Sequence, residues 1–163
     1  MVWLSGKGII LNKIENKIRN IGFELPALSA PVASYIPAII SDKLVFTSGQ
    51  LPLIKGKLET CGVLEKEVDI ELAKTLAKLC VLNGLAAIKN LIGDLDRITR
   101  IIKVVGYVAS TNTFFRQPEV VNGASDFILE VFGENGRHVR TSVGVISLPL
   151  NSPVEIEMIV EIN

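Results

Sequence analysis

The chain has 163 residues, with 17 basic and 17 acidic side chains, so its formal net charge is zero. This length favours one domain, and the balanced charge gives no electrostatic support for binding duplex nucleic acid. Ile, Leu and Val supply 20, 19 and 17 residues, whereas aromatic residues make up only 6%. A domain of this size cannot bury so much aliphatic surface in its own core, because small domains have much surface for their volume. The surplus predicts contact either with a membrane or with copies of the same chain.

The membrane alternative is not supported by the pattern. The longest uncharged stretch, residues 25–41, contains Pro26, Pro31 and Pro37, and prolines at this spacing disfavour a spanning helix. The first residues lack the basic segment and long apolar run of a signal peptide. Two cysteines, Cys61 and Cys80, are too few for a disulfide framework. We therefore expect a cytoplasmic protein with no membrane partner, and self-association becomes the favoured explanation.

Apolar periodicity predicts three helices. The first lies within an N-terminal extension, residues 9–22, and ends near Gly22. The second begins after Asp69, a good N-cap, and ends at Gly93. The third begins at Pro118 and runs to about Phe132. A stripe of small residues predicts that the second helix approaches a sheet closely: Ala73, Ala77, Cys80, Gly84 and Ala87.

Strand-forming residues predict strands over 43–50, 98–109, 139–148 and 153–162, and the last alternates strictly between apolar and polar residues. Residues 25–37 are punctuated by proline and predict an extended segment, while residues 55–57 predict a turn. This order predicts one α+β domain over residues 1–163. Its two main helices should pack on one face of a mixed sheet.

The strand at 139–148 carries the strongest chemical signal. One of its faces presents Arg140, Ser142 and Gly144, so a guanidinium is followed by two very small side chains. This pattern predicts a concave patch beside a positive charge, which suits a small organic acid. The pattern also fits a simpler alternative, in which Arg140 pairs with a surface glutamate.

Glu155 begins the last strand and could orient a water molecule or accept a proton, although it could equally be an outward-facing strand carboxylate. His138, the single histidine, lies at a strand entrance, and we expect it to be a surface loop residue. No His, Cys or carboxylate spacing predicts a metal site, and no glycine-rich phosphate loop is present.

Three segments resemble the reactive intermediate deaminase family, also called the Rid or YjgF family and, in older usage, endoribonuclease L-PSP. They are FTSGQLPL at 46–53, VNGASDFILEVFG at 121–133 and VRTSVGVISLPLNSPVEIEMIVEI at 139–162. The resemblance covers residues 25–163 and is closest to a longer branch with an extra N-terminal helix. It implies a chorismate-mutase-like fold, a homotrimer with clefts between subunits, and cofactor-free hydrolysis of 2-imino or 2-enamino acids to 2-oxo acids and ammonia.

The resemblance also implies roles for particular residues. Arg140 matches the arginine that binds the substrate carboxylate, and Glu155 matches the glutamate that positions the attacking water. Tyr35 matches a tyrosine that lines the pocket, Asn122 matches an asparagine in the family's helix, and Ser48 lies near the same cleft. The resemblance implies that these residues and Ser142 bind the substrate. Two positions depart from the family pattern: Ser142 stands where a cysteine is common, and Ala33-Ser34 replaces a Gly-Pro pair before the tyrosine.

Strand geometry adds a separate inference about Arg140 and Glu155, which begin successive strands. If those strands run antiparallel, seven residues place the two side chains roughly 20 Å apart, at opposite ends of the sheet. They would then share a site only if different subunits supplied them.

Three other functions remain open. The cleft could belong to a regulatory module that binds small acids without turnover, which would require Arg140 but not Glu155. An endoribonuclease is disfavoured by the zero net charge and the single histidine. A structural role as an oligomeric scaffold is the weakest alternative.

Overall fold

The computed structural model describes residues 12–27 and 35–163. Its main sheet has five strands, in the spatial order β1-β2-β7-β5-β6. Their bounds are β1 (Ala38–Ser41), β2 (Leu44–Thr47), β5 (Ile98–Ala109), β6 (Val139–Val145) and β7 (Val154–Ile162), and a separate hairpin comprises β3 (Leu53–Ile54) and β4 (Lys57–Leu58). Strand β5 pairs in parallel with β6 and antiparallel with β7, so the sheet is mixed, as predicted.

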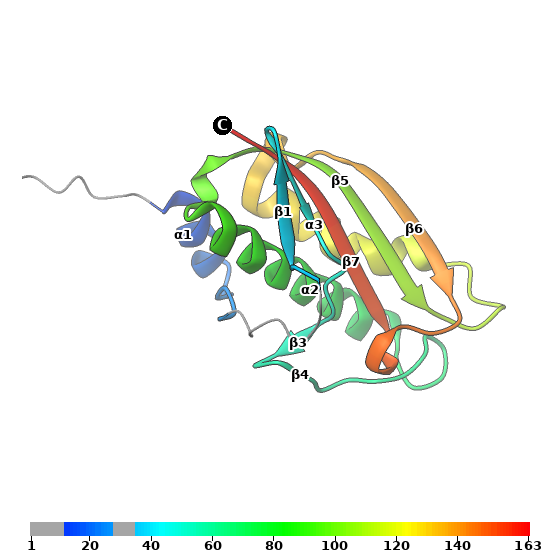
Figure 1. The fold of residues 1–163 in the computed structure, drawn as a ribbon. Helices are drawn as coiled ribbons and strands as arrows, with labels where there is room; N and C mark the ends of the chain where they lie inside the picture. Colours follow the sequence, from blue (N-terminus) through cyan, green and yellow to red (C-terminus); the bar gives the residue numbers. More distant parts are fainter. Residues whose placement is uncertain (1–11, 28–34) are drawn as a thin grey trace, which may run out of the picture.

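Two long helices, α2 (Ile70–Ile92) and α3 (Gln117–Phe132), cover one face of this sheet and leave the other face free of helices (Figure 1). The short α1 (Lys13–Asn20) lies at one end of the helical layer. The predicted α+β architecture is therefore confirmed.

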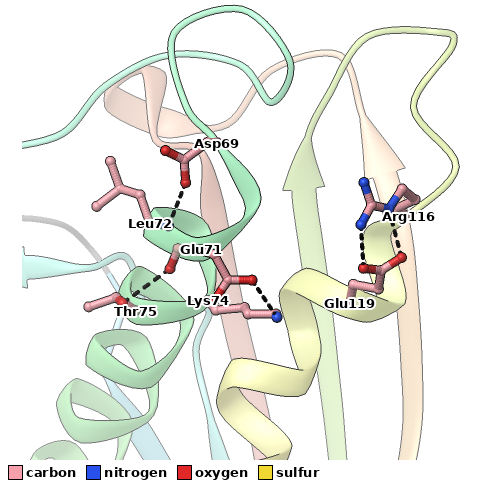
Figure 2. Close-up of polar contacts among 7 residues, drawn as sticks. All are labelled: Asp69, Glu71, Leu72, Lys74, Thr75, Arg116 and Glu119. Carbon is pink, nitrogen blue, oxygen red and sulfur yellow. Dashed lines mark hydrogen bonds and ion pairs between the residues drawn. The ribbon is translucent and has the colours of Figure 1, made fainter.

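The ends and the buried face of α2 follow directly from its sequence. The Asp69 carboxylate accepts the Leu72 backbone N–H at 2.8 Å (Figure 2), and Gly93 ends the helix with a φ of +85°. The predicted small-residue stripe is buried, and a Cβ on Gly84 would lie 2.6 Å from Met158 Cε of β7. Among the described residues, only α2 is long and apolar enough to span a membrane, yet 61% of that window is buried here. It is the core helix of the domain.

Helix α3 approaches the backbone of α2 closely at Gly123. A Cβ on Gly123 would lie 2.7 Å from the Cα and carbonyl carbon of Lys74, so only glycine allows this contact. The first turn of α3 is held by Arg116, whose Nε and Nη2 each donate to the Glu119 carboxylate at 2.7 Å (Figure 2). Asn122 precedes Gly123, so the same contact sets the position of Asn122.

The predicted alternation of β7 is also confirmed. Val154, Ile156, Met158, Val160 and Ile162 are buried against the helices, which leaves the intervening residues on the helix-free face. That face exposes large apolar side chains, including Ile39 at 53% and Val143 at 40%. An uncovered sheet face of this kind is typical of an interface between proteins.

The structure differs from the sequence-based expectation at several elements. The strand expected over 43–50 is shorter, because β2 ends at Thr47. Strand β1 was not predicted; it pairs with β2 through a tight turn in which Asp42 has a φ of +56°. Strand β6 ends at Val145 instead of Leu148. The N-terminal helix begins at Lys13, and the expectations for residues 9–11, Pro31 and Ala33-Ser34 fall outside the described residues.

Candidate functional site

Arg140 lies near the start of β6, an edge strand of the sheet, and faces α3. It pairs with Val104 of β5, whose side chain is buried against the helices, so the two side chains share that face. Its Nη1 donates to Asn122 Oδ1 at 2.8 Å and to Ser125 Oγ at 3.1 Å. No carboxylate in the described part of the chain forms an ion pair with Arg140, so the surface ion-pair alternative is not what the structure shows.

His138 lies in the loop before β6, as expected, but its ring is bound into the same cluster and is not a free surface group. Its Nε2 lies 3.0 Å from Ser125 Oγ, and its Nδ1 lies 2.6 Å from the Gly136 carbonyl oxygen. The ring is half-buried, and Ser125 is only 8% exposed. Sequence reasoning missed both residues, because 13 positions separate them and only the packing of α3 against β6 brings them together.

The concave patch predicted beside Arg140 is only partly present. A Cβ on Gly144 would lie 2.7 Å from Gln117 Nε2 and 2.9 Å from Ser110 Oγ, so these side chains fill the space that was expected to be open. Ser142 lies between Arg140 and Gly144 on the same strand face, and its hydroxyl is buried with no hydrogen-bond partner among the described residues. We call Asn122, Ser125, His138, Arg140 and Ser142 the arginine cluster.

Glu155 lies on the helix-free face, beside the segment that follows β2. A Cβ on Gly49 would lie 2.7 Å from Glu155 Cδ and closer still to Oε1, so the carboxylate occupies space that only glycine leaves open. Burial raises the pKa of Glu155 above its ordinary value, and the negative charge of Glu157 raises it further. A carboxyl group with a raised pKa is suited to accept a proton near neutral pH.

Ser48 joins the segment beside Glu155 to the segment that carries Tyr35. Ser48 precedes Gly49, and its Oγ donates to the Ile36 carbonyl oxygen at 2.7 Å, while its N–H donates to Pro37 O at 2.9 Å. These bonds hold the segment that carries Tyr35, whose side chain is 63% exposed. We call Ser48, Gly49 and Glu155 the glutamate cluster.

Within one chain the two clusters lie on different faces of the sheet. Strands β6 and β7 run antiparallel, as the sequence argument supposed, but β5 lies between them. Arg140 pairs with Val104, and Glu155 pairs with Tyr107, so the offset along β5 is three residues, or about 10 Å. The predicted offset of roughly 20 Å along the strands was too long, because the register is set through β5. The two residues are also separated by the width of β5 and by the opposite directions of their side chains.

No group of three His, Cys, Asp or Glu side chains within residues 12–27 and 35–163 is arranged to hold a metal ion. The chemistry that the two clusters offer is therefore that of a guanidinium, a carboxylate of raised pKa and several neutral hydrogen-bonding groups.

Comparisons with known proteins agree with this architecture. Residues 15–162 match the family described as "YjgF/chorismate_mutase-like, putative endoribonuclease". Protein TCP17 of Trypanosoma cruzi is 37% identical over 154 residues, which cover 93% of this chain and 95% of TCP17. The crystal structure of Atu1372, a protein with unknown function from Agrobacterium tumefaciens, is 46% identical with a TM-score of 0.86, and the match covers 93% of this chain and 94% of that one.

A further structure, of a protein described as a putative endoribonuclease from Shewanella oneidensis, is 33% identical with a TM-score of 0.87. The match covers 91% of this chain and 99% of that one. The chain belongs to the YjgF family, which includes the Rid proteins, and the family resemblance in its sequence is confirmed.

Proposed function

We propose that this protein hydrolyses 2-imino and 2-enamino acids to 2-oxo acids and ammonia in a cleft between subunits of a cytoplasmic homotrimer. The observation that carries the proposal is the environment of Arg140. Its guanidinium is held by neutral acceptors, Asn122 and Ser125, so its positive charge stays available for an anionic ligand. A carboxylate is the natural partner, because it matches the fork of N–H groups on an arginine.

The reaction needs a group that activates water close to the bound carboxylate. Glu155 suits that task, because its raised pKa brings proton acceptance closer to neutral pH. Arg140 holds the substrate carboxylate and thereby fixes the imine carbon, and Glu155 orients a water molecule and takes its proton. The water oxygen adds to the C=N carbon, and the proton held by Glu155 passes to the nitrogen of the resulting carbinolamine. The hydroxyl then gives its proton to the Glu155 carboxylate as the C=O bond forms and the C–N bond breaks, so the nitrogen leaves as ammonia. An enamine first takes a proton on carbon.

Two subunits must supply this site if Arg140 and Glu155 act together, since one chain directs them to opposite faces of its sheet. Packing of the helix-free face of one copy against the β6 edge of its neighbour would bring the glutamate cluster of the first toward the arginine cluster of the second. The apolar residues on that face and the aliphatic surplus of the sequence both support such an assembly.

A direct assay tests the activity. An imine such as 2-iminobutanoate is generated in situ by an amino-acid oxidase, and its conversion to the 2-oxo acid is followed with and without the protein. We expect the wild type to accelerate hydrolysis and Arg140→Ala to abolish the acceleration. Equal rates for the two proteins would remove the proposed mechanism. Binding of 2-oxo acids without acceleration of imine hydrolysis would favour the regulatory module. RNA cleavage that needs no metal and persists through purification would favour the endoribonuclease.

Mixed oligomers test whether two subunits build the site. Arg140→Ala and Glu155→Gln chains should each be inactive alone. When they are co-expressed at equal levels, about a quarter of the interfaces should contain both intact residues, so about a quarter of the wild-type activity should return. Arg140→Ala co-expressed with the double variant is the matched control and should regain nothing, because no intact arginine is present. Absence of recovery in the first pair would show that one chain supplies the whole site.

A further inference from the structure

The arginine cluster contains hydrogen bonds beyond those that a carboxylate-binding arginine requires. Ser125 and His138 extend the contacts of Arg140 inward to the backbone at Gly136. The proposed reaction assigns neither residue a role. The direction of each hydrogen bond in this chain of contacts shows what the two residues do.

The first direction is fixed at the backbone end. The carbonyl oxygen of Gly136 can only accept, so Nδ1 of His138 carries the proton that joins them. In the neutral ring Nε2 is then an acceptor, and the Ser125 hydroxyl must donate to it. Arg140 has no acceptor atoms, so its Nη1 donates to the Ser125 oxygen. The three bonds run in one direction, from Arg140 through Ser125 and His138 to Gly136, and bonds aligned in this way strengthen one another.

Only some of the N–H groups of Arg140 are used by contacts within the chain. Nη1 has two hydrogens, and Asn122 and Ser125 provide an acceptor for each. These two residues lie three positions apart on α3, and therefore on one face of that helix. Within the described residues, neither Nε nor Nη2 of Arg140 has a hydrogen-bond partner. The Nε and Nη2 edge carries two parallel N–H groups, which match the two oxygens of a carboxylate.

We propose that Ser125 and His138 are positioning residues, which hold the Arg140 guanidinium so that its Nε–Nη2 edge faces the ligand carboxylate. This inference rests on the proposed function for the nature of the ligand. Ser125 is not placed as a nucleophile, because its oxygen accepts a hydrogen bond from Arg140 and its residue is only 8% exposed. His138 fixes the direction of the Ser125 hydroxyl, and Ser125 transmits that direction to the guanidinium.

The single histidine makes the first test direct, because a sample labelled with ¹⁵N-histidine contains one imidazole. Ring ¹⁵N and ¹H chemical shifts of the neutral imidazole should show a protonated Nδ1 and an unprotonated, hydrogen-bonded Nε2. In Ser125→Ala the Nε2 shift should move, because its donor is lost. A ring protonated on Nε2 alone would overturn the inference, and this measurement on the wild type depends on no variant being folded.

The second test measures binding of 2-oxobutanoate by calorimetry. Ser125→Ala and His138→Leu should each weaken binding about five- to twenty-fold, the effect of losing one hydrogen bond that orients a charged group. His138→Gln retains an acceptor near the position of Nε2 and should restore binding to within about three-fold of the wild type. Arg137→Ala is the matched control, because Arg137 lies next to His138 but bonds to Glu134, and it should bind normally.

The outcomes separate this inference from the proposed function. If the variants bind as predicted but the wild type hydrolyses no imine, the positioning role stands and the enzymatic proposal fails. If the wild type hydrolyses imines and Ser125→Ala binds 2-oxobutanoate as tightly as the wild type, the positioning role fails. Equal weakening by His138→Gln and His138→Leu would also overturn it, because the acceptor would then be irrelevant.

Discussion

Gly49 lies against the Glu155 carboxylate, so we predict that a larger side chain at position 49 displaces that carboxylate. Gly49→Ala introduces one methyl group at a position whose φ lies outside the left-handed region, so the backbone itself tolerates alanine. The new Cβ would lie 2.7 Å from Glu155 Cδ and 3.0 Å from its Cγ. Carbon atoms in contact prefer about 3.5–4.0 Å, so the carboxylate must move by at least about 1 Å.

The expected effects on stability and on catalysis differ. The displaced atoms are the end of a flexible side chain, so the free energy of unfolding should change by less than about 1 kcal/mol. A general base must lie within hydrogen-bond reach of its water, and a displacement of about 1 Å can cost on the order of 100-fold in rate. We therefore expect kcat for imine hydrolysis to fall about 100-fold, while the melting temperature stays close to that of the wild type.

Gly93→Ala is the matched control, because it adds the same methyl group with nothing within 4 Å of it. Its φ of +85° makes alanine strained, at a cost of about 1 kcal/mol or more, so the melting temperature should fall by roughly 2–4 °C. Its kcat should not change. The reasoning is refuted if Gly49→Ala keeps kcat within about three-fold of the wild type, or if its activity falls only in proportion to lost folded protein.

Three further predictions concern Glu155, Glu157 and Gly123. Folding raises the Glu155 pKa, so the ionised carboxylate destabilises the folded state at a pH above that pKa. Glu155→Gln should therefore raise the melting temperature at pH 8 more than at pH 4. The same change should lower kcat on the order of 100- to 10,000-fold, because the proposed base is lost. Glu157→Gln removes a neighbouring negative charge, so the acidic limb of the kcat profile should move to lower pH. Gly123→Ala forces Cβ against the Lys74 backbone, and urea unfolding should show a loss of about 3 kcal/mol.

Much of the fold could be predicted because its elements carry local signals. Strand β5 is β-branched along most of its length, and it was predicted with the bounds that the structure shows. Helix α2 has an N-cap at one end and a glycine at the other, and both act within one turn. Strand β1 had no such signal, because its four residues are defined by pairing with β2 instead of by their own pattern.

The site was harder to predict, because its geometry depends on pairing between distant segments. Alternation shows which residues of β6 or β7 share a face, but it does not relate the faces of two strands that are not neighbours. Here that relation passes through β5, which pairs with both strands. The partnership of Ser125 with His138 likewise arises from helix packing, which no local pattern encodes.

The placement of Arg140 and Glu155 on opposite faces separates their effects on folding from their effects on catalysis. Within one chain the two side chains share no partner, so Arg140→Ala and Glu155→Gln should change the unfolding free energy of a single subunit additively, to within about 0.5 kcal/mol. If neighbouring subunits share the site as proposed, the same two changes affect one reaction, and a double-mutant cycle on kcat should be far from additive. Under that proposal, one chain carries two halves of a reaction that are independent in folding and coupled only by assembly.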